Sequence, residues 1–116
     1  MTRTSLPLPT VHLERVNAVM DNLIAAGVVD GDREILDKAS AVRDSTRTQA
    51  PLVEPGRTYP VELTAEQWEF TVDAVEADAD TDDYLAGIPG FENDAAMWAA
   101  AAADMRATAS ALRQLL

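Results

Sequence analysis

The sequence predicts an all-α fold, a small bundle of four helices forming two helical hairpins, with a proline-rich extended connector between them. Apolar residues recur at three- and four-residue spacing in four stretches, cap-forming residues stand at their starts, and prolines gather between the second and third. We expect one helical domain over residues 1–116, with an N-terminal hairpin at 1–48, a connector at 49–63, and an acidic helix and an Ala-rich helix at 64–116.

The N-terminal hairpin is expected to contain two amphipathic helices. Thr10 is the N-cap expected for a first helix from Val11 to Ala26, and Gly27 is the expected left-handed residue after its end. Asp30 or Asp32 is then expected to cap a second helix. Its apolar stripe is formed by Ile35, Ala39, Val42 and Thr46.

The connector, QAPLVEPGRTYPVEL, holds three prolines and one glycine. Proline blocks a helix interior and disfavours a central strand, so we expect this segment to be extended, with at most a short edge strand. Val53, Tyr59 and Val61 are expected to hold it against the helices.

The third helix has the clearest start signal. Thr64 and Gln67 have the spacing of a capping box, and Leu63 and Trp68 have that of a hydrophobic staple. The helix is expected to fray over residues 78–83, where like charges accumulate at its negative C-terminal end. A turn is expected in AGIPGF, residues 86–91.

The last helix is expected to begin after Asn93 or Asp94 and to carry a narrow seam of small and apolar residues at four-three spacing. The seam comprises Trp98, Ala102, Met105, Ala109, Leu112 and Leu116. It predicts either packing within the chain or self-association as a homodimer through its members from Trp98 to Leu112, and both interpretations stay open. The scarcity of large apolar residues favours association that buries more surface.

Charge is the strongest functional signal in this chain of net charge −11. Between Arg57 and Arg106 every charged side chain is acidic. On a helical wheel five of these fall in one sector, with Phe70 beside them. This acidic ridge consists of Glu66, Glu69, Asp73, Glu76 and Asp80.

The acidic ridge predicts a non-enzymatic interaction protein that docks on a basic surface of a partner protein, with Phe70 as the apolar anchor. Its charge spacing is comparable to that of DNA phosphates, so such a protein could inhibit a nucleic-acid-binding partner by mimicking DNA. A self-associating structural or adaptor protein is the alternative, and a merely solvated acidic face is the simplest interpretation.

Several partners and compartments are disfavoured. Without a basic patch we expect no direct binding to nucleic acid, and the longest apolar run, residues 95–103, is too short to span a membrane. The N-terminal stretch lacks an apolar signal region, so a cytoplasmic location is expected. The composition, with 21 Ala and eight Arg against one Lys, resembles that encoded by GC-rich genomes such as those of actinobacteria or their phages.

Carboxylate pairs suggest a second alternative. Glu66 and Glu69 are spaced as metal-binding pairs are on a helix, which resembles the all-α nucleotide pyrophosphohydrolases and would imply Mg²⁺-dependent hydrolysis. The partner pair would be Asp80 with Asp83, or Glu92 with Asp94 at a different spacing.

Other chemistry is not indicated by the sequence. Asp78, Asp80 and Asp82 match the alternate ligands of an EF-hand loop, but Asp83 and Pro89 replace its Gly and its bidentate Glu. There is no Cys, and the single histidine has no nucleophile motif nearby. We therefore expect no catalytic residues, no bound metal and no cofactor.

Overall fold

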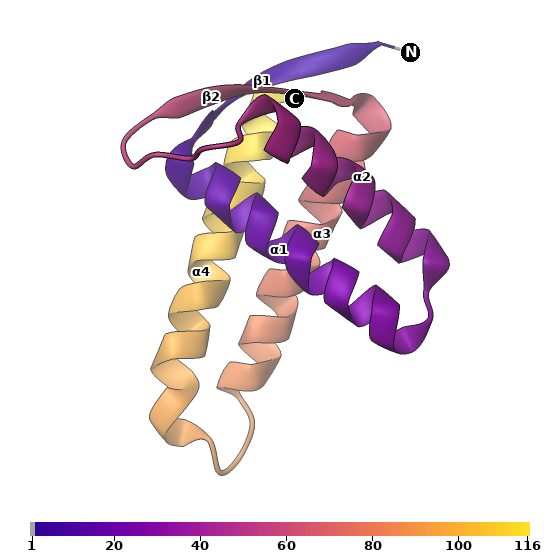
Figure 1. Cartoon of the computed structure of the whole chain (residues 1–116). Helices are drawn as coiled ribbons and strands as arrows, with labels where there is room; N and C mark the ends of the chain where they lie inside the picture. Colours follow the sequence, from indigo (N-terminus) through magenta and orange to yellow (C-terminus); the bar gives the residue numbers. More distant parts are fainter. Residues whose placement is uncertain (1) are drawn as a thin grey trace. The chain divides into compact units, whose positions relative to one another are not determined.

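The computed structural model describes residues 2–116, which form two strands and four helices (Figure 1). In chain order these are β1 (Arg3–Pro9), α1 (Thr10–Asp30), α2 (Arg33–Gln49), β2 (Thr58–Thr64), α3 (Ala65–Ala86) and α4 (Glu92–Leu115). The four helices confirm the mostly helical character, but the all-α prediction is wrong, because β1 and β2 pair as a two-stranded antiparallel sheet. The chain therefore has a mixed α/β fold.

The chain divides into two compact units within α3. The N-terminal unit covers Met1–Thr71 and the C-terminal unit covers Val72–Leu116. The N-terminal unit contains the sheet, α1, α2 and the start of α3, and the C-terminal unit contains the rest of α3 and α4.

The sheet has one buried face. Leu6 and Leu8 of β1 and Val61 and Leu63 of β2 are almost fully buried, and the residues between them are exposed. This alternation is the period-two pattern of a strand with one covered face. The prolines concealed it, because proline normally disfavours strand interiors.

Hydrogen bonding explains why these prolines are tolerated. Backbone groups along an antiparallel strand point alternately toward the neighbouring strand and away from it. Thr10 N–H donates to Arg57 O at 2.8 Å, next to the paired Pro9 and Thr58, so the even-numbered residues of β1 face β2. The odd-numbered ones face away; they are Arg3, Ser5, Pro7 and Pro9. Pro7 and Pro9 thus replace only N–H groups that would not join the ladder.

Trp68 anchors the start of α3 in the N-terminal unit. Its side chain is fully buried, and its indole N–H donates to the carbonyl of Thr4 at 2.9 Å. The predicted capping box is confirmed, since Gln67 N–H donates to Thr64 Oγ1 at 3.1 Å and Thr64 N–H donates to Gln67 Oε1 at 2.9 Å. The residue that ends β2 therefore also caps α3.

The hairpin of α1 and α2 differs from its prediction at both ends of α1. Helix α1 already includes Thr10, and Pro9 occupies the N-cap position without a side-chain hydrogen bond, so the prediction of Thr10 as the cap is wrong. The Thr10 hydroxyl instead donates to the carbonyl of Arg57 at 3.1 Å. Helix α1 continues past Gly27 to Asp30, and the left-handed residue is Gly31, with φ of 69°. Gly27 instead allows close packing, because a Cβ there would lie 3.2 Å from the Cβ of Leu36. Asp32 is confirmed as the cap of α2, since its side chain accepts from Ile35 N–H at 3.2 Å.

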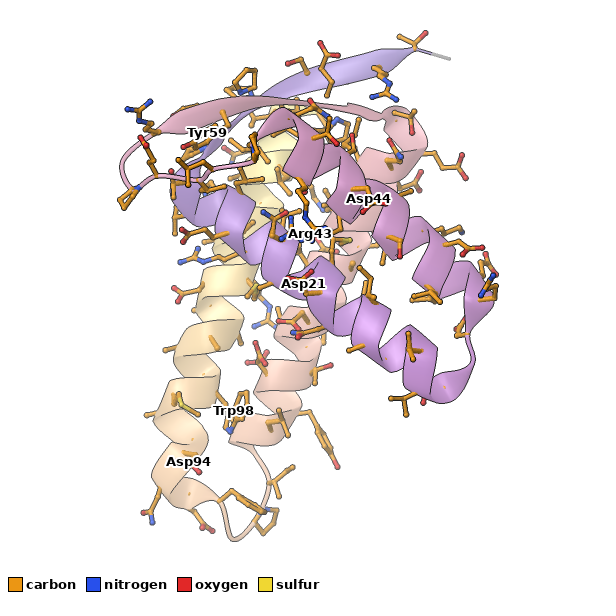
Figure 2. The ribbon with its side chains drawn as sticks, viewed as in Figure 1. Asp21, Arg43, Asp44, Tyr59, Asp94 and Trp98 are labelled. Carbon is orange, nitrogen blue, oxygen red and sulfur yellow. The ribbon has the colours of Figure 1, made fainter. Side chains whose placement is uncertain are left out.

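An ion pair links these two helices. Figure 2 shows Arg43 of α2 directed toward Asp21 of α1, and their Nε and Oδ1 atoms lie 3.0 Å apart. Nearby, Thr46 Oγ1 donates to Asn17 Oδ1 at 2.8 Å.

The C-terminal unit is a pair of antiparallel helical segments joined by a tight turn (Figure 1). The expected fraying at residues 78–83 does not occur, because α3 continues to Ala86. The expected turn is present, but α4 begins at Glu92, before both predicted caps. Glu92 instead accepts a hydrogen bond from Gly90 N–H at 3.0 Å. None of the helices within residues 2–116 is long and apolar enough to span a membrane.

Replacing Trp68 with Phe should destabilise the protein by about 2 kcal/mol, because it removes the hydrogen bond to Thr4 and part of a fully buried ring system. Urea unfolding followed by circular dichroism measures this loss. The matched control is Trp98→Phe, whose parent side chain is only half-buried. An equal loss in both variants would contradict the anchoring role of Trp68.

Candidate functional site

The structure separates the acidic ridge into two environments. In the C-terminal unit its three carboxylates meet arginines of α4. Arg113 forms a bidentate pair with Glu76, at 2.7 and 2.8 Å, and its Nη2 lies 3.7 Å from Asp73 Oδ1. Arg106 lies 3.2 Å from Asp80 and also contacts Asp83. The row of unneutralised charges that the sequence suggested therefore does not extend over this part of α3.

These pairs change the electrostatics of that surface. The hydrogen bond from Arg113 lowers the pKa of Glu76, and the bond to Asp83 raises the pKa of Arg106. A cavity of about 340 Å³ lies here. Its charged lining residues are all in ion pairs; they are Glu76, Asp80, Arg106 and Arg113. The cavity therefore offers little uncompensated charge to a ligand.

The remaining ridge residues lie in the N-terminal unit beside an apolar hollow. A cavity of about 330 Å³ lies between α2 and the start of α3, and we call it the Phe70 groove. Its lining residues are Asp37, Lys38, Ala41, Val42, Thr64, Glu66, Gln67 and Phe70. Phe70 is half-buried, and it forms part of the groove wall.

The charged residues that line the Phe70 groove are Asp37, Lys38 and Glu66. Lys38 Nζ lies 2.9 Å from Glu34 Oε1, and this hydrogen bond raises the pKa of Lys38. Asp37 lies 3.6 Å from Arg33. In contrast, Glu66 and Glu69 are exposed and form no ion pair within residues 2–116. The groove thus combines an apolar wall with the carboxylate of Glu66, whose charge also raises the pKa of Lys38, and the exposed Glu69 directly precedes Phe70 in the chain.

Sequence reasoning identified Phe70, Glu66 and Glu69 but missed the opposite wall. Ala41 and Val42 of α2 line the groove and were assigned only to the helix. The sequence carries no spacing that indicates these two residues, because they meet Phe70 only through the packing of α2 against the start of α3.

The sequence-predicted self-association seam is mostly buried. Ala102, Ala109 and Leu112 are almost fully buried, while Trp98 and Met105 are half-buried. Figure 2 shows Trp98 on the side of α4 that faces α3. These positions agree with packing within the chain at the three buried residues.

The carboxylates considered for metal binding do not form a ligand cluster. Asp78, Asp80 and Asp82 lie within the continuous helix α3, where alternate residues point about 200° apart and so cannot enclose a cation as a loop does. Glu66–Glu69 and Asp80–Asp83 are both on α3, so they do not supply the second helix that a two-pair Mg²⁺ site needs. The other predicted pair, Glu92 with Asp94, lies at the start of α4 in the C-terminal unit, whereas Glu66 and Glu69 belong to the N-terminal unit. Over residues 2–116 no three His, Cys, Asp or Glu side chains are grouped to hold a metal ion.

No protein-family model, curated protein or solved structure matches this chain.

Asp82 is a buried carboxyl group one helical turn after Asp78. Burial raises the pKa of Asp82, and the neighbouring charge of Asp78 raises it further. Burial also raises the pKa of Asp78, although its hydrogen bond with Asp82 opposes this change. The two carboxyl groups therefore act on each other, and the net effect is a raised pKa at both.

The variant Asp82→Asn should raise stability at neutral pH and have little effect near pH 3. Below its ordinary pKa of 3.8, Asp82 is protonated in both the folded and unfolded states. As the pH rises, Asp82 loses its proton in the unfolded state before it does so in the folded state, because its folded-state pKa is raised. The unsubstituted protein therefore loses stability as the pH rises, whereas the Asp82→Asn variant, which does not titrate at this position, keeps it.

Urea unfolding of both proteins at about pH 7 and about pH 3 measures the difference. Asp44→Asn, at an exposed site on α2, is the control for the change of net charge. A gain for Asp82→Asn that is the same at both pH values would contradict this prediction.

Proposed function

We propose that this protein is a small, non-enzymatic interaction protein whose Phe70 groove binds a basic segment of a partner protein. The observation that carries the proposal is the half-buried ring of Phe70 in an apolar groove that the exposed Glu66 also lines, with the exposed Glu69 directly before Phe70 in the chain. A cation beside an apolar side chain on a partner is the chemistry complementary to this surface.

The size of the groove supports a protein partner. Its volume of about 330 Å³ is at the low end for small-molecule sites, and it is open to solvent at a helix-helix boundary. One or two apolar side chains from a partner would fill it. Since α2 and α3 are regular helices at this point, the groove exists before the partner arrives.

Electrostatics favour a basic partner. The chain has a net charge of −11, which attracts cationic surfaces over a distance and accelerates their encounter. At the groove itself, Lys38 is hydrogen-bonded to Glu34 and also interacts with the charge of Glu66. Neither Glu66 nor the neighbouring Glu69 forms an ion pair within residues 2–116. Arginine or lysine from the partner would supply the missing countercharges.

Inhibition of a nucleic-acid-binding partner is a narrower form of the same proposal. If the basic surface normally binds nucleic acid, this protein would compete for it. The contact would rest on Glu66 and Glu69, because Asp73, Glu76 and Asp80 already lie near arginines of α4. The short length of this contact favours inhibition by local binding at one site over mimicry of an extended row of phosphates.

A displayed random-peptide library, panned on the purified protein, tests the proposal. Selected peptides should carry an aromatic or aliphatic residue flanked by Lys or Arg. Their affinity should fall about tenfold between about 50 and about 200 mM salt, because screening weakens exposed charge contacts. Selection of acidic or uncharged peptides, or binding that does not respond to salt, would count against a basic partner.

Matched variants locate the binding site. Phe70→Ala and the pair Glu66→Lys with Glu69→Lys should each weaken the selected peptides at least about tenfold, since they remove the apolar wall or reverse the two free charges. The pair Glu14→Lys with Asp44→Lys changes net charge equally at exposed positions on α1 and α2 and should weaken binding much less. Equal losses in both pairs would show a net-charge effect without a site.

A further inference from the structure

The outer edge of β1 carries unpaired backbone groups. The register and the Thr10–Arg57 hydrogen bond place the backbone groups of the odd-numbered residues on the side away from β2. On this side Arg3 and Ser5 each present an N–H and a carbonyl, whereas Pro7 and Pro9 present carbonyls only. Their side chains are exposed, and no hydrogen bond within residues 2–116 engages the N–H of Arg3 or Ser5.

The outer edge of β2 is closed by contrast. Both backbone groups of Glu62 are bonded to the side-chain amide of Gln49, N–H to Oε1 at 2.6 Å and carbonyl to Nε2 at 2.8 Å. Two residues away on one side, Pro60 has no N–H. Two residues away on the other, Thr64 N–H is bonded to Gln67. The sheet therefore has one protected edge and one open edge.

We propose that β1 pairs with β1 of a second copy of this chain, in antiparallel orientation across a two-fold axis near Ser5. Strand order in the dimer is then β2-β1-β1-β2, one continuous four-stranded sheet. The Arg3 and Ser5 N–H groups of each copy meet carbonyls of the other copy. Pro7 and Pro9 have no N–H to donate, and they contribute only carbonyls, which can accept hydrogen bonds.

A second copy fits this edge because the edge is self-complementary in hydrogen bonding and nearly free of charge. Each copy offers two donors and at least as many acceptors over the same few residues, which a two-fold axis can satisfy in both directions. The only charged side chain on β1 is Arg3. Two chains of net charge −11 can thus approach here without placing carboxylates of the paired strands opposite each other.

The protected edge sets the size of the assembly. After pairing, both outer edges of the four-stranded sheet are β2 edges, and each is closed by Gln49, Pro60 and Gln67. These hydrogen bonds disfavour the addition of a third strand, so the assembly is expected to stop at two copies instead of growing into a fibre.

Sedimentation of the full chain over a concentration series tests the proposal, with Ser5→Pro as the variant and Ser5→Ala as its control. Ser5→Pro removes one outward donor per copy and leaves the β1–β2 ladder intact, as Pro7 and Pro9 already do. It should weaken dimerisation at least about tenfold, because two hydrogen bonds per dimer are lost. Ser5→Ala keeps the N–H and should dimerise like the native chain.

Amide hydrogen exchange of the native chain provides a readout that does not depend on a variant folding. Protection of the Arg3 and Ser5 amides should rise with protein concentration, while that of Glu62, bonded within the chain, should stay constant. A native chain that is monomeric at about 1 mM, or a Ser5→Pro variant with unchanged dimer affinity, would overturn the proposal. Concentration-independent exchange of Arg3 and Ser5 would also overturn it.

Discussion

The hydrogen bond from the Trp68 indole to the Thr4 carbonyl is the contact on which the N-terminal unit depends. Thr4 belongs to β1, whose one partner strand among residues 2–116 is β2. Strand β2 in turn leads directly into the cap of α3. Burying Trp68 therefore fixes both the strand pairing and the rotation of α3 about its own axis. That rotation turns Glu66 and Phe70 toward α2, which creates the groove.

Local features were predictable from the sequence because they depend on residues close together in the chain. The cap at Asp32 and the capping box at Thr64 and Gln67 each involve residues three apart. The sheet was missed because its strands are distant in sequence, and because the outward positions of Pro7 and Pro9 become evident only once a partner strand is known. The helical wheel placed Glu66 and Phe70 beside each other on α3, but the residues of α2 that line the Phe70 groove are brought there by tertiary packing.

The acid-rich helix is not one electrostatic surface. Arg106 and Arg113 offset the like-charge repulsion along the second half of α3, and they could not be assigned to it by spacing because they belong to a different helix. At Asp78 and Asp82 burial raises the pKa of both carboxyl groups, and the charge of Asp78 raises that of Asp82 further. In the first turns of α3, Glu66 and Glu69 form no ion pair with an arginine, although the charge of Glu66 raises the pKa of Lys38, and the apolar groove lies there.

The long separation between Thr4 and Trp68 also affects synthesis. A ribosome must add 64 residues after Thr4 before the indole that binds its carbonyl exists, which takes about 3 to 13 seconds at usual elongation rates. Helices α1 and α2 are complete within that interval, whereas β1 emerges with Leu6 and Leu8 uncovered. The nascent chain thus exposes the apolar side chains of β1, which a chaperone can bind until β2 and Trp68 have been translated.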